Sequence, residues 1–194
     1  VICPYGEDRV ASSESGYLAS QDIAGRGNPN LKTPTPKSQK PEAFDTPNLR
    51  TIEEISHKYN VIPHQMIKTL IFMADDKPVA ALVTGENEVN EGKLRKLIGA
   101  KTIRQAEAHE IRDATGAPVG FAGPIGLKIP VYADWDVIGI ADGVTGANEE
   151  DKHFRNVTYG RDFTPTATGD IRFVKDGDRA PDGSGTLKLT ASME

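Results

Sequence analysis

The sequence predicts a mixed α/β domain that follows a segment with little regular structure. Apolar, β-prone runs alternate along the chain with segments of helical character, which is typical of this fold class. By contrast, residues 24–43 hold Gly, Pro, Ser, Asn and Lys and almost nothing apolar. Proline disfavours helices and central strands, so we expect a linker or an adhering arm there. We assign residues 1–43 to a flanking segment and Pro/Gly-rich linker, and residues 44–194 to the folded domain.

The first helix is predicted from its start signal. Thr51 and Glu54 have the spacing of a capping box, in which the hydroxyl accepts from the Glu54 N–H and the carboxylate reaches back. The helix that follows places Ile52, Ile55 and Tyr59 on one face. This apolar face predicts packing against the rest of the domain.

The next elements are predicted from apolar runs and caps. After a short turn at residues 63–64, residues 67–74 and 79–83 form two β-prone runs joined by a polar turn, which predicts a hairpin. Asn90 and Gly99 then bracket a second helix as its N-cap and C-terminal glycine. Further elements are expected in this order: a helix at 106–114, strands at 131–133 and 137–141, a loop with a short helix at 142–153, a strand at 171–174, and a turn-rich hairpin at 177–189.

The composition excludes several classes of protein. With 37% hydrophobic and 26% charged residues in 194, the chain is neither membrane-spanning nor wholly disordered. Cys3 is the only cysteine, which excludes an intrachain disulfide and a cysteine-rich zinc site. Together with the lack of a secretory signal, this predicts a cytoplasmic protein with no membrane partner. The net charge of −5 leaves room only for a local basic patch, for which the cluster at residues 93–104 is a candidate; a solvated helix face is the simpler interpretation.

The loop at residues 120–126 is the most unusual local feature. Gly120 and Gly123 allow the backbone to approach a ligand closely, while Pro124 stiffens the path. Such a loop can present amide donors to a carbonyl oxygen or a phosphate. A tight connection between strands is the simpler interpretation. Neither a Walker A motif nor a dinucleotide-binding fingerprint is present.

Two side chains outside the loop are also candidates. Lys68 lies in an otherwise apolar run and shares a face with Leu70 and Phe72, so its ammonium is expected at the edge of a pocket, where it can hold a phosphate or carbonyl. Alternatively, it is an edge-strand lysine that guards against aggregation. His153 follows Asn148 in a polar, carboxylate-containing segment, which suits an acid–base pair, a weak metal site or a solvated loop.

The order of the motifs is shared with a known family. From about Phe44 to the end, the chain resembles the YbaK-type aminoacyl-tRNA editing domain, most closely the form inserted in bacterial prolyl-tRNA synthetase. Residues 6–8 and 189–194 resemble the flanks of that insertion, and the start at Val1 is typical of a piece cut from a longer protein. The segments that carry the resemblance are TPNLRTIEEI, IKTLIFMADDKPVAALVTGENEVNEGKLRKLIGA, EIRDATGAPVGFAGPIGLKIPVYAD, GANEEDKHFRNVTYGRDF and DIRFVKDGD.

The resemblance implies a mixed β-sheet or partial barrel surrounded by helices, and hydrolysis of mischarged tRNA, chiefly alanyl-tRNA(Pro). It implies no metal, because Ala180 and Gly183 stand where family members often carry a Cys-Pro-x-Cys pair. It places the working residues in two groups. The catalytic group is Lys68, Gly120, Gly123 and Pro124, and the substrate-binding group is His153, Asp134, Phe121, Ala122 and Asn148. From its position alone, Asp134 is equally well a cap or an ion-pair partner.

The mechanism expected from the resemblance is direct attack by water on the aminoacyl ester, because no side-chain nucleophile is evident. The implied partners are the acceptor end of tRNA(Pro) carrying alanine and the remainder of the synthetase, a parent enzyme expected to be a homodimer. Editing would need no cofactor, since ATP serves only the aminoacylation site of the parent enzyme, which this chain lacks. Two alternatives stay open: a non-catalytic module that positions tRNA, and a free-standing trans-editing deacylase with another amino-acid specificity.

Overall fold

The predicted hairpin forms the centre of the fold in the computed structural model, which describes residues 9–36 and 39–191. Strands β4 (Met66–Ala74) and β5 (Lys77–Thr84) pair antiparallel along their whole length. The turn residues Asp75 and Asp76 both have positive φ, at 47° and 61°, as tight two-residue hairpin turns require. Cys3, residues 6–8 and the last three residues of the closing motif lie outside the described range.

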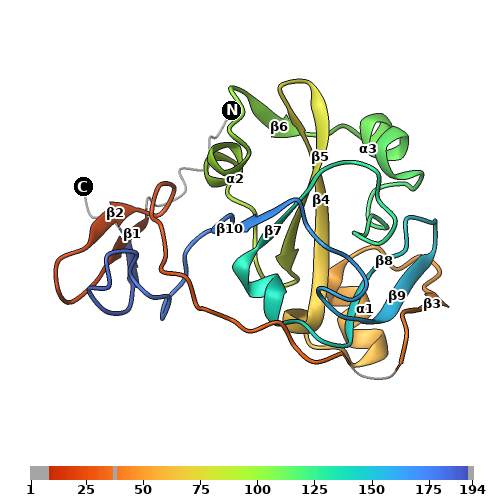
Figure 1. The fold of residues 1–194 in the computed structure, drawn as a ribbon, viewed down its shortest axis with the longest axis horizontal. Helices are drawn as coiled ribbons and strands as arrows, with labels where there is room; N and C mark the ends of the chain where they lie inside the picture. Colours follow the sequence, from red (N-terminus) through yellow and green to blue (C-terminus); the bar gives the residue numbers. More distant parts are fainter. Residues whose placement is uncertain (1–8, 37–38, 192–194) are drawn as a thin grey trace.

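A mixed sheet extends from this hairpin on both sides (Figure 1). Its order is β10-β7-β5-β4-β8-β9-β3, and β6 also pairs with β4. Strands β7 and β8 run parallel to β5 and β4 respectively, whereas β9, β3 and β6 pair antiparallel with their neighbours. The strands that join the hairpin are β3 (Glu42–Asp45), β6 (Ile103–Gln105), β7 (Val131–Asp134), β8 (Gly143–Gly146), β9 (Lys152–Val157) and β10 (Ala167–Gly169).

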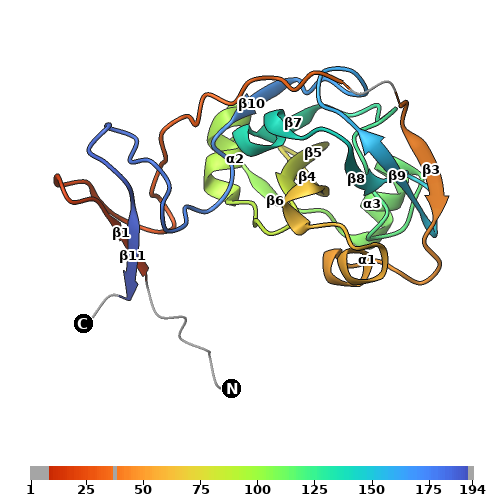
Figure 2. The same ribbon diagram turned by 90° about the horizontal axis from the view of Figure 1, so that it is seen from below.

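Three helices lie around the sheet, and their starts confirm the capping signals (Figures 1 and 2). Helix α1 (Ile52–Tyr59) begins with the Thr51–Glu54 capping box. Helix α2 (Glu91–Ile98) begins at Asn90, whose side chain accepts from the Lys93 N–H, and ends at Gly99 in a left-handed conformation. Helix α3 (Ala108–Thr115) lies close to the predicted range, and the short turn after α1 is a 3₁₀ helix, η1 (Pro63–Gln65).

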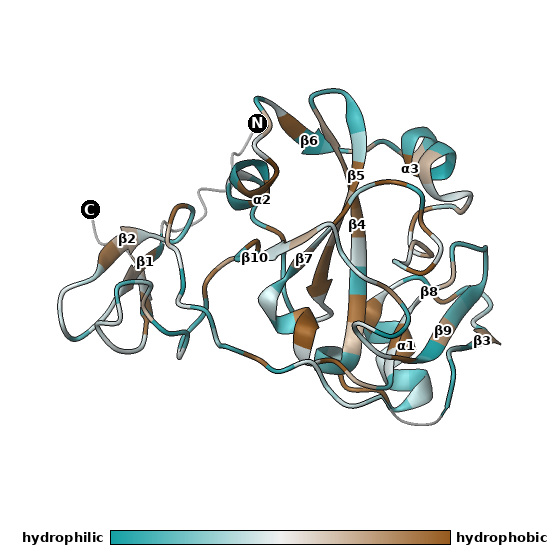
Figure 3. Ribbon diagram, in the orientation of Figure 1, coloured by the Kyte–Doolittle hydropathy of each residue, from teal (hydrophilic) through white to brown (hydrophobic). Residues whose placement is uncertain are grey.

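The apolar side chains gather on the central strands, as the hydropathy colouring of β4 and β5 shows (Figure 3). One buried cluster includes Ile67, Ile71 and Leu82, and a second includes Phe72 and the helix residue Leu94. Alternation along β4 sends these side chains to opposite faces. Both faces of the central hairpin are therefore buried, which makes it a rigid support for whatever lies beside it.

A small three-stranded antiparallel sheet stands beside the main body (Figure 2). Its order is β11-β1-β2, and it joins β1 (Arg9–Ser12) and β2 (Leu18–Ser20) to β11 (Lys188–Ala191). The sequence predicts little regular structure before residue 45. Strands β1 and β2 were not predicted because they are short and because β1 pairs with β11 at the other end of the chain. The division at residue 43 stays a prediction.

Three element predictions are wrong in detail. Residues 137–141 form no strand, because a 3₁₀ helix, η2 (Trp135–Gly139), begins where Asp134 accepts from the Asp136 N–H. Residues 142–153 hold no helix; they form β8 and the start of β9. The glycines of β8 led to the prediction of a loop there. In place of the strand at 171–174, Arg172 forms an isolated bridge with Val89. Within the described ranges, no helix is long and apolar enough to cross a membrane.

Candidate functional site

One edge of β4 is paired only at its two ends. Strand β8 pairs with its first two residues and β6 with its last three. In the part of the chain that the structure describes, no strand pairs with residues 68–71 along this edge. The sheet therefore has a gap between β8 and β6, directly beside the rigid central hairpin.

The main-chain groups of Thr69 face this gap. The carbonyl of Ile67 accepts from Thr145 Oγ1 at 2.9 Å, and the carbonyl of Ile71 accepts from the Ala106 N–H at 3.0 Å, both across the open edge. Alternate residues of a strand direct their main-chain groups to the same side, so those of Thr69 point the same way. The gap thus offers a backbone donor and acceptor to a ligand.

A cavity of about 570 Å³ fills the gap. Its walls come from β4, α1 and the residue before its cap, the loop at 119–122, the ends of β8 and β9, and the start of α3. One end is apolar, because Ile55, Met66 and Val144 form a buried cluster there. The charged part of the wall is formed by Arg50, Lys68 and three glutamates, Glu53, Glu86 and Glu88. The cavity therefore suits a ligand with a small apolar group and a charged remainder.

Lys68 lines the cavity from β4. Its side chain is only 17% exposed, and Nζ donates to Glu88 Oε1 at 2.7 Å, while Glu88 itself is 72% exposed. Strand β4 is not an edge strand, because it lies between β5 and β8, although its edge is unpaired at Lys68 itself. A half-buried ammonium held by one exposed carboxylate is ready to exchange that partner for an anionic ligand.

His153 lines the cavity from β9 and is buried. Its Nδ1 lies 2.6 Å from Thr46 Oγ1, and its ring packs edge-on against Phe121, with centroids 5.7 Å apart. Burial lowers the pKa of His153 to about 4, so the imidazole is neutral at pH 7. Within the described chain, no group of three His, Cys, Asp or Glu side chains is placed to hold a metal ion.

The glycine loop is pressed against the end of β8. A Cβ added to Gly123 would lie 1.8 Å from the carbonyl oxygen of Gly146, so neither glycine tolerates a side chain without a backbone shift. Asn148 fastens the loop: its Oδ1 accepts from the Gly123 N–H at 2.8 Å, and its Nδ2 donates to the carbonyls of Gly123 and Ile125 at 2.9 and 3.1 Å. Asn148 therefore braces the loop from behind.

Two amides of the loop have no hydrogen-bond partner among the described residues. Gly120 and Ala122 line the cavity, and their N–H groups meet no acceptor within residues 9–36 and 39–191. Gly120 has φ of +98°, which glycine adopts without strain. The N–H of Gly123 is already bound to Asn148, so Gly123 contributes the position of the loop and not a free donor.

Asp134 does not line this cavity and belongs instead to a network of buried charges. Its carboxylate pairs with Arg26 and accepts from the N–H groups of Ile171 and Arg172 at 3.0 and 3.2 Å. Burial raises the pKa of Asp134, and the charge of Arg26 opposes that rise. Asp134 is both a cap and an ion-pair partner, because its carboxylate accepts from the Asp136 N–H at the start of η2 and pairs with Arg26.

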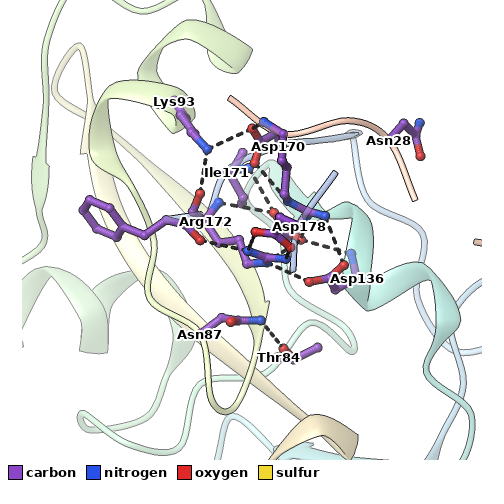
Figure 4. A network of polar contacts seen from close by, with 12 residues as sticks. Asn28, Thr84, Asn87, Lys93, Asp136, Asp170, Ile171, Arg172 and Asp178 are labelled. Carbon is purple, nitrogen blue, oxygen red and sulfur yellow. Dashed lines mark hydrogen bonds and ion pairs between the residues drawn. The ribbon is translucent and has the colours of Figure 1, made fainter. Parts of the chain in front are cut away.

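The network joins segments that are far apart in the chain. Arg172 pairs with Asp136 at 2.7 Å and with Asp178 at 2.6 Å, and Lys93 pairs with Asp170 at 2.8 Å (Figure 4). Arg26, from the segment predicted to be a linker, is nearly fully buried in it. Lys93, the first residue of the candidate basic patch at residues 93–104, thus forms an internal ion pair. The cations are Arg26, Lys93 and Arg172, and the anions are Asp134, Asp136, Asp170 and Asp178.

The structure brings four of the sequence candidates to the cavity wall: Lys68, Gly120, Ala122 and His153. The cavity wall does not include Phe121, Gly123, Pro124 or Asn148. Phe121 packs against His153 of the wall, and Asn148 binds Gly123 within the loop. Sequence reasoning missed Arg50, Glu88 and Thr46. Only Arg50 carried a signal, since it directly precedes the capping box of α1.

Similarity to known proteins shows the family of the chain. Residues 46–163 match the family described as "Aminoacyl-tRNA editing domain". The chain belongs to this family. Proline--tRNA ligase of Geobacter sulfurreducens is 41% identical over 196 residues, covering 100% of this chain and 34% of that protein. The same enzyme of Bacillus velezensis is 38% identical over 195 residues, covering 97% and 34%. The chain therefore spans about a third of the length of these curated relatives.

The fold also has solved counterparts. A crystal structure described as a candidate trans-editing enzyme for prolyl-tRNA synthetase superposes with a TM-score of 0.59 and 24% identity, covering 69% of this chain and 87% of the other. This likeness confirms the expected mixed α/β fold of the YbaK-type editing domains, with a large mixed sheet and three helices in the described residues.

Proposed function

We propose that this chain hydrolyses the ester of mischarged aminoacyl-tRNA, chiefly alanyl-tRNA(Pro). The observation that carries the proposal is the pair of unfilled loop amides, Gly120 and Ala122, on the wall of a cavity that also holds Lys68. Membership of the editing family and the 41% identity to a proline--tRNA ligase support the choice of substrate. In this role the chain would act in the cytoplasm as part of a prolyl-tRNA synthetase.

The cavity suggests how such a substrate lies. The methyl group of alanine fits the apolar end formed by Ile55, Met66 and Val144. The neutral imidazole of His153 can accept a hydrogen bond from the amino group of the substrate. Lys68 is placed to hold the terminal ribose or its phosphate once Glu88 gives way. The ester carbonyl then lies between these groups, at the loop.

The proposed chemistry needs no side-chain nucleophile. Water attacks the carbonyl carbon, the ester C–O bond breaks, and the ribose oxygen leaves with a proton. The amides of Gly120 and Ala122 stabilise the oxyanion that develops, a contribution of about 10²–10³ in rate for a single donor in acyl transfer. The vicinal ribose hydroxyl orients the attacking water. No step involves a cofactor, and ATP would serve only the aminoacylation site of a parent enzyme.

Selectivity in this proposal comes from size. A synthetic site built for proline cannot strongly reject the smaller alanine, because a few missing methylene groups are worth only about 1–3 kcal/mol. A second pocket that admits alanine and excludes proline by steric clash supplies the rest. Because Ile55 and Met66 are buried and closely packed, the apolar end has little freedom to enlarge.

Lys68→Ala is the direct test. We expect deacylation of alanyl-tRNA(Pro) to fall by about two orders of magnitude or more, as for loss of one charged group at a reacting centre, with unchanged thermal unfolding. Lys152→Ala is the matched control, since Lys152 pairs with Glu149 at 2.5 Å outside the cavity and should leave the rate unchanged.

The same assay separates the alternatives. A wild-type chain that leaves alanyl-tRNA(Pro) intact but binds it would be a non-catalytic positioning module. Hydrolysis of another aminoacyl-tRNA in preference to alanyl-tRNA would indicate a deacylase of different specificity. Equal rates for wild type and Lys68→Ala would remove Lys68 from the mechanism.

A further inference from the structure

We propose that Arg50 binds a backbone phosphate of the single-stranded acceptor end, as a second cationic contact beside Lys68. This inference rests on the proposed function, because it assumes that the ligand of the cavity is the 3′ end of an RNA. Arg50 and Lys68 are the only arginine or lysine side chains on the cavity wall within the described chain. Since the protein carries a net charge of −5, attraction of a polyanion must come from such local cations.

The backbone of Arg50 is fixed in place. Its N–H donates to Glu54 Oε2 at 2.9 Å, so the capping box of α1 holds it as well as Thr51. On its other side it lies against the loop: a Cβ added to Gly120 would lie 2.9 Å from the Cβ of Arg50. The missing side chain of Gly120 therefore lets Arg50 touch the loop that carries the free amides.

The guanidinium of Arg50, by contrast, is free to exchange partners. The side chain is 55% exposed, and its guanidinium carbon lies 5.6 Å from the centroid of the Phe121 ring, which orients it. Its ion pair with Glu150 is long, at 3.6 Å, and Glu150 is 60% exposed. Exposed pairs of this kind contribute little, whereas arginine binds phosphate through two parallel hydrogen bonds.

Lys68 and Arg50 share one arrangement on two walls of the cavity. Each cation is placed by the fold, and each is paired with a highly exposed glutamate, Glu88 and Glu150 respectively. Both glutamates can swing into solvent when a phosphate arrives. With the free amides of the loop beside Arg50, the nucleotide that bears the ester would be held by one cation on each side of the reacting bond.

Arg155 offers a matched control for this test. It is 51% exposed, pairs with Glu42 at 2.8 Å, and lies 5.8 Å from the ring centroid of Phe44, yet it does not line the cavity. Arg50→Gln and Arg155→Gln therefore remove the same charge from the same kind of surface. Both variants replace the guanidinium with a neutral polar group and are expected to fold.

The experiment measures deacylation of alanyl-tRNA(Pro) at several salt concentrations. It also measures binding of an RNA hairpin that ends in CCA and carries no amino acid. For Arg50→Gln we expect KM and the dissociation constant of the hairpin to rise about tenfold, as for one charged hydrogen-bonded contact. The slope of log affinity against log salt should become shallower by about 0.7, the value for one phosphate on a single strand. We expect kcat to be unchanged, and Arg155→Gln to match wild type in every measurement.

Several outcomes would overturn the inference. An Arg50→Gln variant with wild-type KM and salt slope has no phosphate contact to lose. An equal loss in Arg155→Gln would assign the effect to overall charge, and a loss of kcat alone would make Arg50 a support of the loop. If the wild type fails to deacylate, the proposed function fails, while hairpin binding by the two variants still decides whether Arg50 contacts RNA.

Discussion

The cavity beside β4 and the charge network around Arg172 treat buried polar groups in opposite ways. In the network, Arg172 pairs with Asp136 and Asp178 at 2.6–2.7 Å, and the buried carboxylate of Asp134 accepts three backbone hydrogen bonds. In the cavity, the hydroxyl of Thr69 is buried with no partner among the described residues. The N–H of the buried residue Ala122 likewise has no partner in the described chain.

This difference separates two tasks. Groups whose hydrogen bonds are complete hold distant segments of the chain together, and they gain nothing from a ligand. Groups that are left incomplete cost stability in the empty protein and recover it when a ligand arrives. We therefore expect substitutions in the network to change stability and those at the cavity to change activity.

The largest expected effect comes from Arg172→Ala. It would leave Asp178 buried without its cation and Asp136 with only its longer pair to Arg26, and removing one partner of a buried ion pair typically costs about 3–5 kcal/mol. Urea unfolding measures the loss, and the exposed Arg155→Ala should barely move the midpoint. Deacylation by the folded fraction should keep its kcat. A stable Arg172→Ala protein with impaired catalysis would break the separation between the two regions.

A smaller effect is expected from His153 as the pH falls. Burial lowers its pKa to about 4 from the usual 6.5, so between these values the unfolded chain binds a proton that the folded chain refuses. The stabilisation is complete above pH 6.5 and is lost progressively toward pH 4, by about 2 kcal/mol between pH 7 and pH 5.

The comparison variant is His153→Gln, which cannot take up this proton. Its free energy of unfolding should decline less between pH 7 and pH 5 than that of the wild type, and urea titrations at both values measure the difference. Parallel declines in the two proteins would contradict the assigned burial of the imidazole.

The smallest expected effect sharpens the comparison within the cavity itself. Thr69→Val removes a buried hydroxyl that has no partner in the described chain, so it should stabilise the protein by about 1 kcal/mol. Thr145→Val removes a hydroxyl that donates to the Ile67 carbonyl, so it should destabilise by about 1 kcal/mol. Thermal unfolding of both variants decides, and equal signs would show that Thr69 is satisfied in solution.

Local signals predicted the local structure well. The capping box at Thr51, the cap at Asn90 and the hairpin of β4 and β5 are confirmed because each depends on neighbours within a few residues. Among the site residues predicted from the sequence, the structure gathers Lys68, Gly120, Ala122 and His153 at one cavity, and their roles stay predictions. The resemblance to the editing family supplied their grouping, since spacing in the chain does not reveal it.

The misses share a different physical origin. Arg26 lies in a segment with almost no apolar residues, yet its side chain is buried by carboxylates that lie more than a hundred positions away. Strand β8 is rich in glycine, and it becomes a strand because β4 and β9 flank it. Arg50 precedes the capping box of α1, but only the fold sets it against Gly120. Long-range contacts decide each of these, and no local pattern records them.

The backbone contact between Gly123 and Gly146 has a consequence for inheritance and for inhibitor design. Gly146 lines the cavity and Gly123 packs against it, so this contact presents only main-chain atoms, which are the same for every amino acid. Few substitutions could therefore weaken the binding of a compound that forms hydrogen bonds with those atoms. Under the proposed function, changes in amino-acid preference would arise where side chains face the cavity, as on α1, while the loop itself would stay unchanged.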